Sequence, residues 1–179
     1  MEQPTIRIGV SACLLGQKVR HDGGHKHNRY LTEILADFFE LVSTCPEAEV
    51  GMGTPRESVR LSGDIEDPQM VSRSGVDWTG RMNRWSRGKV KKLADDDLHG
   101  FVFMKRSPSR VPVMQENGQP LPGRGLFALE FTRAFPRLPV EESGRLSDPR
   151  LRENFLERVF AHHRVTRLFE GRWKRGDVV

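Results

Sequence analysis

The stretch that decides the fold is residues 5–16, TIRIGVSACLLG. Its first half, residues 5–10, alternates polar and apolar positions and is rich in β-branched side chains, so it predicts a β-strand. Small residues and Gly16 follow directly, which predicts a loop at the carboxyl end of that strand. In α/β proteins, ligands bind beyond the carboxyl ends of parallel strands. This loop is therefore the first place to look for a functional site.

Strands and helices alternate along the rest of the chain. Helical spacing of apolar residues predicts helices at 30–39, 77–93, 125–135 and 148–169, with Thr79 and Asp148 as N-caps. Short apolar or alternating runs predict further strands at 40–43, 57–61, 101–104 and 137–140, whereas 63–74 is expected to be an exposed loop. This order predicts an α/β fold of Rossmann-like type, with a mostly parallel sheet flanked by helices and a C-terminal helix.

Composition narrows the class of protein. The chain has 179 residues, of which 36% are hydrophobic and 30% charged, a balance typical of a folded globular domain. It has no run of 18 apolar residues and no basic N-terminal stretch followed by an apolar one, so we expect neither a membrane span nor a secretory signal. Two cysteines exclude a disulfide scaffold. These features predict a cytoplasmic protein.

The net charge of +5 is unevenly distributed. Residues 145–176 contain nine Arg or Lys against four Asp or Glu. Such an excess is typical of a solvated helix face, but it also permits a stripe that contacts phosphates.

Two cysteines follow predicted strands directly. Cys13 lies in the loop after the first strand, and Cys45 lies just beyond the strand at 40–43. If these strands are parallel, the two loops meet at one edge of the sheet, together with residues 106–109 after the strand at 101–104. The cysteines are then either two unrelated thiols or a pair of thiolate ligands for a soft metal or an iron–sulfur cluster. Two thiolates need a further ligand to hold such a cluster.

Other polar residues of these loops suggest chemistry. Glu47 follows Cys45 by two residues and is a candidate general base for a water molecule. Arg56 is placed either to meet a substrate oxygen or to pair with Glu57. Ser107 and Ser109 are candidate hydrogen-bond donors to a carbonyl or an anion, or caps of the next segment.

A histidine-containing loop lies between the first strand and the first helix. His21, His25 and His27 surround Asp22 and two glycines. This loop permits a zinc site, although a solvated or phosphate-facing loop fits its composition equally, because Asp-Gly-Gly alone predicts a turn.

These short stretches, taken in order, resemble a known family. The chain is similar to the thiouracil desulfidases, formerly a family of unknown function. The resemblance rests on VSACLLG (10–16), DGG (22–24), CPE (45–47), GMGTPRE (51–57) and RSPS (106–109). The stretches at 123–128, 138–142 and 148–164 resemble the branch in which a second, helical domain follows. The resemblance implies a desulfidase-like α/β domain over 1–146, with the C-terminal helix and the start of a truncated second domain over 147–179.

The resemblance also implies a reaction. The family removes sulfur from 2-thiouracil or a related thiopyrimidine and releases hydrogen sulfide, using a 4Fe-4S cluster that three cysteines hold and whose open iron binds the substrate's sulfur. Cys13 and Cys45 match two of the three ligand positions, Glu47 matches the acid that activates water, and Ser107 matches the serine that orients the substrate. Further substrate contacts are expected from Ser11, Asp22, Arg56 and Ser109.

One departure from the family pattern leaves alternatives open. The family has its third cysteine directly after the serine that Ser109 matches, but here Arg110 follows, and no third cysteine exists. A substitute ligand such as His21, His25 or Ser109, or a group from a second subunit in a homodimer, would then be needed. The alternatives are a cluster-free, inactive relative that binds a small pyrimidine-like or anionic ligand, and a basic nucleic-acid-associated module.

Overall fold

The computed structural model describes residues 5–105, 113–115 and 118–170. Within these residues the main sheet has four strands in the order β2-β1-β5-β8, and every neighbouring pair is parallel. The strands are β1 (Arg7–Ser11), β2 (Glu40–Thr44), β5 (Leu98–Phe103) and β8 (Val140–Glu142). The predicted parallel α/β sheet is confirmed, and the strand in residues 5–10 is one of its two central strands.

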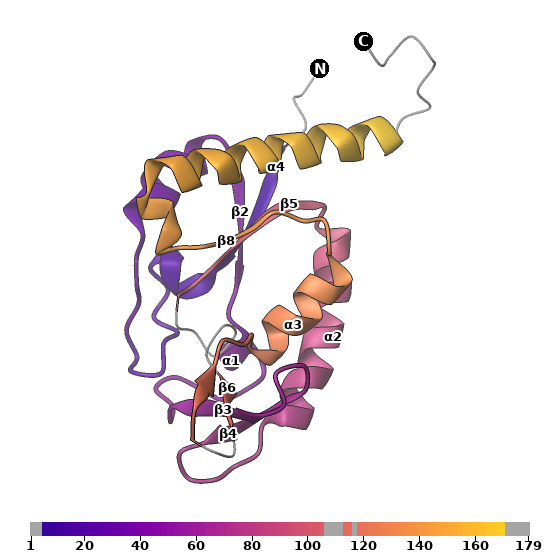
Figure 1. Ribbon diagram of the computed structural model, residues 1–179. Coiled ribbons are helices and arrows are strands. Elements are labelled where there is room, and N and C mark those ends of the chain that lie inside the picture. Colours follow the sequence, from indigo (N-terminus) through magenta and orange to yellow (C-terminus); the bar gives the residue numbers. More distant parts are fainter. Residues whose placement is uncertain (1–4, 106–112, 116–117, 171–179) are drawn as a thin grey trace.

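Helices cover both faces of this sheet (Figure 1). On one face α2 (Thr79–Asp95) and α3 (Leu126–Ala134) pack together over Phe101 and Phe103 of β5. On the other face α4 (Pro149–Glu170) packs through Phe155 and Val159 against β1 and β5. Along β5, Phe101 and Phe103 face the first core and Val102 faces the second, as the period of a strand requires. Ile8 and Val10 of β1 also face the second core. The fold is therefore a three-layer α/β arrangement with the C-terminal helix forming one layer.

The ring of Phe101 explains a glycine in β1. A Cβ atom on Gly9 would overlap with Cδ2 of Phe101, on the neighbouring strand of the same sheet. Only a residue without a side chain leaves room for the Phe101 ring at this point.

A second sheet corrects two of the sequence predictions. Among the described residues its order is β4-β3-β6-β7, with β3 (Val59–Gly63), β4 (Pro68–Ser72), β6 (Val113–Met114) and β7 (Pro120–Leu121). The predicted strand at 57–61 belongs to this sheet, not to the parallel one. The loop predicted at 63–74 is wrong, because residues 68–72 pair antiparallel with β3 and bury Met70. The turn residues around this short strand obscured its alternation.

Further corrections concern the helices. Residues 30–39 form no α-helix; a π-helical turn, η2 (Tyr30–Ile34), is followed by a 3-10 turn, η3 (Leu35–Asp37). Thr79 is not the cap of α2: its hydroxyl accepts a hydrogen bond from Met70 N, while Asp77 Oδ1 accepts one from Thr79 N.

Other predicted elements are confirmed. Asp148 caps α4, since its Oδ1 accepts hydrogen bonds from the N–H groups of Arg150 and Leu151. The predicted helix at 125–135 is present as α3, one residue shorter at each end. None of the described helices combines the length and the apolar character that a membrane span requires.

A buried histidine cluster joins α4 to the start of β5. His99 is fully buried, and its Nε2 atom lies 3.0 Å from Nδ1 of His163 on α4. The ring of His162 also packs edge-on against His99, and Arg167 of α4 donates a hydrogen bond of 2.9 Å to Asp97. Burial lowers the pKa of His99 to about 4; the Asp97 carboxylate opposes this shift, and positive charge on His163, His162 and Arg167 adds to it. Burial also lowers the pKa of His162.

This cluster predicts a loss of stability in mild acid. The ordinary pKa of 6.5 applies to His99 in the unfolded chain, whereas the folded value is about 4, so the unfolded state takes up protons first as the pH falls. The contribution of His99 is complete above pH 6.5 and declines between 6.5 and 4. Between pH 7 and pH 5 we expect the free energy of unfolding to fall by about 2 kcal/mol, because His99 stays neutral in the folded protein but is protonated in the unfolded chain. Urea denaturation at several pH values should show that the free energy of unfolding falls less steeply from pH 7 to pH 5 in His99→Gln than in the wild type. The same pH dependence in both proteins would contradict a role for His99.

Candidate functional site

The two cysteines meet at the carboxyl edge of the main sheet. β1 and β2 pair in register, with Ser11 opposite Thr44 as the last pair. Cys13 then lies in a 3-10 turn, η1 (Ala12–Leu15), and Cys45 lies directly before α1 (Pro46–Glu49). Both thiols experience the charges of Glu47 and Arg56, which places them in one electrostatic environment. The predicted convergence of these two loops is confirmed.

The turn after β2 places the Glu47 carboxylate beside the Cys45 thiol. Pro46 starts α1, and Glu49 accepts a hydrogen bond from the Cys45 backbone N–H at 2.9 Å, which fixes the start of this short helix. Glu47 is thereby buried, and its Oε2 atom accepts a hydrogen bond from the Cys45 thiol at 3.6 Å. In Figure 1, α1 lies between the two sheets, and Glu47 on this helix is only 3% exposed.

A buried ion pair completes this arrangement. The guanidinium of Arg56 lies 3.7 Å from Glu47 Oε2, and the two side chains are only 8% and 4% exposed. Arg56 also donates hydrogen bonds to the carbonyls of Val19, at 2.8 Å, and Gly53, at 3.2 Å. It therefore links the segments after β1 and β2 to the turn at 51–55. Its predicted pairing with Glu57 is wrong, since the Glu57 carboxylate accepts hydrogen bonds from the backbone N–H and hydroxyl of Ser74.

Burial keeps both thiols protonated in the absence of a bound cation. It raises the pKa of Cys45 to about 12, and the negative charge of Glu47 adds to the shift. Burial also raises the pKa of Cys13, although the positive charge of Arg20 opposes the shift. A bound metal reverses this balance, because a coordinating thiol is deprotonated.

The other predicted site residues have varied surroundings. Ser11 is buried, and its hydroxyl accepts a hydrogen bond from Met104 N at 2.9 Å, so it joins the ends of β1 and β5. Asp22 contacts its own loop, where it accepts a hydrogen bond from Gly24 N and pairs with Arg20. Ser107 and Ser109 lie outside the described residues.

The histidine loop packs beside Cys13 without forming a metal site. The N–H groups of Lys26 and Asn28 donate to the carbonyls of Cys13 and Leu14, which fastens the loop to the turn after β1. His27 Nε2 lies 2.7 Å from the Thr32 hydroxyl. Across the described part of the chain, no three His, Cys, Asp or Glu side chains are grouped so that they could hold a metal ion.

Sequence reasoning missed two residues of this site. The hydroxyl of Thr44, at the end of β2, is buried without a hydrogen-bond partner among the described residues. Arg20 acts on Cys13 through its charge. The position of Thr44 at the end of a strand, directly before Cys45, is the sequence feature from which it could have been predicted.

Comparison with known proteins identifies the family. The model of the 2-thiouracil desulfurase family matches residues 8–143, which is most of the chain and includes Cys13, Cys45, Glu47 and Arg56. The protein belongs to this family. A solved structure, described as the 4Fe-4S-dependent thiouracil desulfidase TudS, is similar with a TM-score of 0.65 and 27% sequence identity. The similarity covers 84% of this chain and 97% of that one. No curated protein matches the sequence.

The donors of this 2-thiouracil desulfurase family member do not fit a cluster bound through three cysteines of one chain. The sequence contains only Cys13 and Cys45, and neither lies in a three-donor group within the described residues. The chain therefore supplies at most two of the thiolates that such a cluster requires. The missing thiolate corresponds to the third cysteine of the family pattern, which this sequence does not contain.

The buried ion pair predicts a double-mutant coupling. Replacing Arg56 with Gln removes this cation from beside the buried Glu47 carboxylate, which should cost about 3 kcal/mol of unfolding free energy. In Glu47→Gln/Arg56→Gln the carboxylate is also gone, so part of this loss should be recovered. Urea denaturation of the wild type, both single variants and the double variant measures the coupling. Additive losses would contradict a direct interaction between the two side chains.

Proposed function

We propose that this protein removes the sulfur of 2-thiouracil or a related thiopyrimidine at the carboxyl edge of its parallel sheet. The observation that carries the proposal is the group formed by Cys45, Glu47 and Arg56, which lies within the family match together with Cys13. The similar protein TudS is by its name a thiouracil desulfidase that depends on a 4Fe-4S cluster. We propose that the substrate is a free small molecule and that the reaction takes place in the cytoplasm.

The reaction requires water and no net electron transfer. The thiocarbonyl carbon gains the oxygen of water and loses its sulfur, and the two protons of water leave with that sulfur as hydrogen sulfide. A base must therefore accept a proton from water, and an acid must deliver protons to the departing sulfur. These steps set the tasks of the residues at the site.

Glu47 suits the proton-transfer task. Its carboxylate is held by Arg56 and accepts from the Cys45 thiol, in an interior where such interactions are stronger than in water. We propose that Glu47 accepts the proton of the attacking water and that Arg56 orients the carboxylate. From the family resemblance, we propose that Ser107 orients the heterocycle and that Ser11, Asp22 and Ser109 bind the substrate.

The cysteines suit iron binding but do not complete it. Cys13 and Cys45 are two soft ligands at one edge of the sheet, the chemistry that an iron–sulfur cluster requires. A third ligand has to come from a group other than a cysteine of this chain. The proposed proton transfers rest on Glu47 and Arg56 and do not depend on which group this is.

Activity of the glutamate variants tests the proposal. Protein purified without oxygen and supplied with iron and sulfide should convert 2-thiouracil to equal amounts of uracil and hydrogen sulfide, measured by chromatography and by sulfide assay. Glu47→Gln should lower the rate by at least about 100-fold, since it removes a general base. Glu33→Gln alters an exposed acid that pairs with Arg29 on the surface, so it is the matched control.

Two outcomes would contradict the proposal in different ways. Full activity of Glu47→Gln, with the fold verified by circular dichroism, would remove Glu47 from the reaction. Binding of 2-thiouracil by the iron-supplied wild type without release of uracil or sulfide would instead identify a relative that has kept the pocket and lost the reaction.

A further inference from the structure

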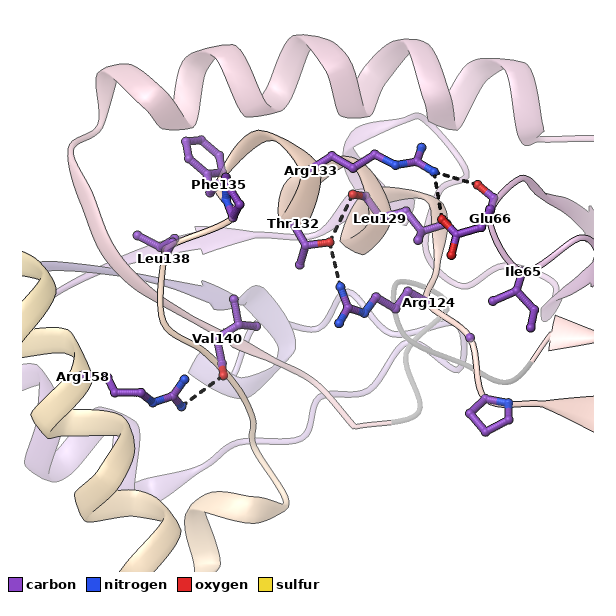
Figure 2. Close-up of a pocket in the computed structure, with 13 residues that line it drawn as sticks. Ile65, Glu66, Arg124, Leu129, Thr132, Arg133, Phe135, Leu138, Val140 and Arg158 are labelled. Atoms are coloured by element: carbon purple, nitrogen blue, oxygen red, sulfur yellow. Dashed lines mark hydrogen bonds and ion pairs between the residues drawn. The ribbon is translucent and has the colours of Figure 1, made fainter.

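A second pocket lies away from the cysteine site. It has a volume of about 810 Å³ and lies where α3, the start of β8 and α4 meet the loop between β3 and β4 (Figure 2). None of Cys13, Cys45, Glu47 or Arg56 lines it. Its volume falls within the range of small-molecule sites, about 300–1,000 Å³.

Three arginines from distant parts of the chain line this pocket. Arg124 precedes α3, Arg133 lies near the end of α3, and Arg158 comes from α4. In Figure 2, Arg124 points toward Thr132, Arg133 points toward Glu66, and Arg158 lies beside Val140 on another side of the pocket. Guanidinium groups present paired donors that match phosphate and carboxylate geometry, so three of them in the lining of one pocket point to an anionic ligand.

The positive charge of Arg124 is not neutralised by a carboxylate within the described residues. Its guanidinium donates to the Thr132 hydroxyl at 2.9 Å, and that hydroxyl donates in turn to the carbonyl of Ala128 at 2.8 Å. The contact orients Arg124 through a neutral group. The guanidinium therefore keeps further donors for a ligand.

The other two arginines are only partly neutralised. Arg133 meets the Glu66 carboxylate at 3.4 Å, and both side chains are largely exposed. Arg158 lies 3.9 Å from Glu141, a carboxylate that is already engaged by Arg145 at 2.8 Å. Among the residues that line the pocket, three guanidinium groups face one carboxylate, an excess that suits a dianion.

Part of the pocket lining, called the floor below, is apolar. Leu129 and Leu138 are buried and Phe135 and Val140 are partly buried, and all four line the pocket beside the arginines. A bare inorganic anion would leave this surface without a partner. A ligand with an apolar or aromatic part and a strongly charged end would use both halves of the pocket.

We propose that this pocket binds a small organic phosphate monoester, with its phosphate among Arg124, Arg133 and Arg158 and its apolar part on the Leu129–Phe135–Leu138–Val140 floor. A phosphate monoester is close to a dianion at neutral pH, because its second pKa lies near 6. The site is separate from the proposed desulfidation, so its test does not depend on iron or on sulfur release.

Isothermal titration with phenyl phosphate, with inorganic phosphate as the comparison, tests the proposal. Phenyl phosphate should bind at least about 10-fold more tightly than inorganic phosphate, since only the ester covers the floor. Arg124→Gln should weaken phenyl phosphate about 10-fold, and Glu66→Gln should strengthen it, because the competing carboxylate is gone. Arg87→Gln removes the same charge from an exposed site on α2 that does not line the pocket, and it should leave binding unchanged.

Three results would overturn the proposal. The first is a wild type that does not bind phenyl phosphate. The second is equal affinity for inorganic phosphate and the ester, which would mean that the floor does not bind the apolar part of the ester. The third is equal weakening by Arg124→Gln and Arg87→Gln, which would reveal a general charge effect. Circular dichroism of each variant separates loss of binding from loss of fold.

Discussion

The pairing of β1 with β2 is the constraint on which the site depends. The two strands run parallel and in register up to Ser11 and Thr44, so the chain leaves the sheet at the same level from both. Cys13 and Cys45 are brought together for this reason, although 31 residues separate them in the sequence. A slip of one residue would turn Ile8 and Val10 out of the core. The register that buries these side chains therefore also assembles the site.

Charge compensation then shapes the site beyond the sheet. A carboxylate as buried as Glu47 needs a cation, and Arg56 supplies it from a turn that follows later in the chain. The same guanidinium fixes the carbonyls of Val19 and Gly53, so one side chain holds three loops around the thiols. Cys13 is buried and Cys45 is half-buried, and this burial raises the pKa of both thiols, so a bound cation would be needed to ionise them at neutral pH. The chain contributes only these two thiols as soft ligands.

The sequence predicted the features that depend on local pattern. Alternation in residues 5–10 predicted β1, and the position of each cysteine after a strand predicted their convergence. The strand β4 and the π-helical turn at Tyr30–Ile34 were missed, because each depends on tertiary pairing or on a tight connection, not on local periodicity. The partner of Arg56 was also missed. Glu57 is its neighbour in sequence, but the fold brings Glu47 to it across the loops. The family pattern identified Ser107 and Ser109, and these lie outside the described residues.

The cysteine site and the arginine pocket occupy separate parts of the fold. The cysteine site lies where β1 and β2 end, whereas the arginine pocket lies beside the start of β8 and is lined in part by residues of α3 and α4. In both, segments that are distant in sequence bring like side chains to one place.

The most direct test of the account is the source of the oxygen in the product. Iron-supplied protein is incubated with 2-thiouracil in water enriched in oxygen-18, and the uracil is analysed by mass spectrometry. The account predicts that one oxygen-18 atom enters each uracil molecule as one hydrogen sulfide is released. Uracil formed without the label, or no uracil at all, would contradict hydrolytic desulfidation at this site.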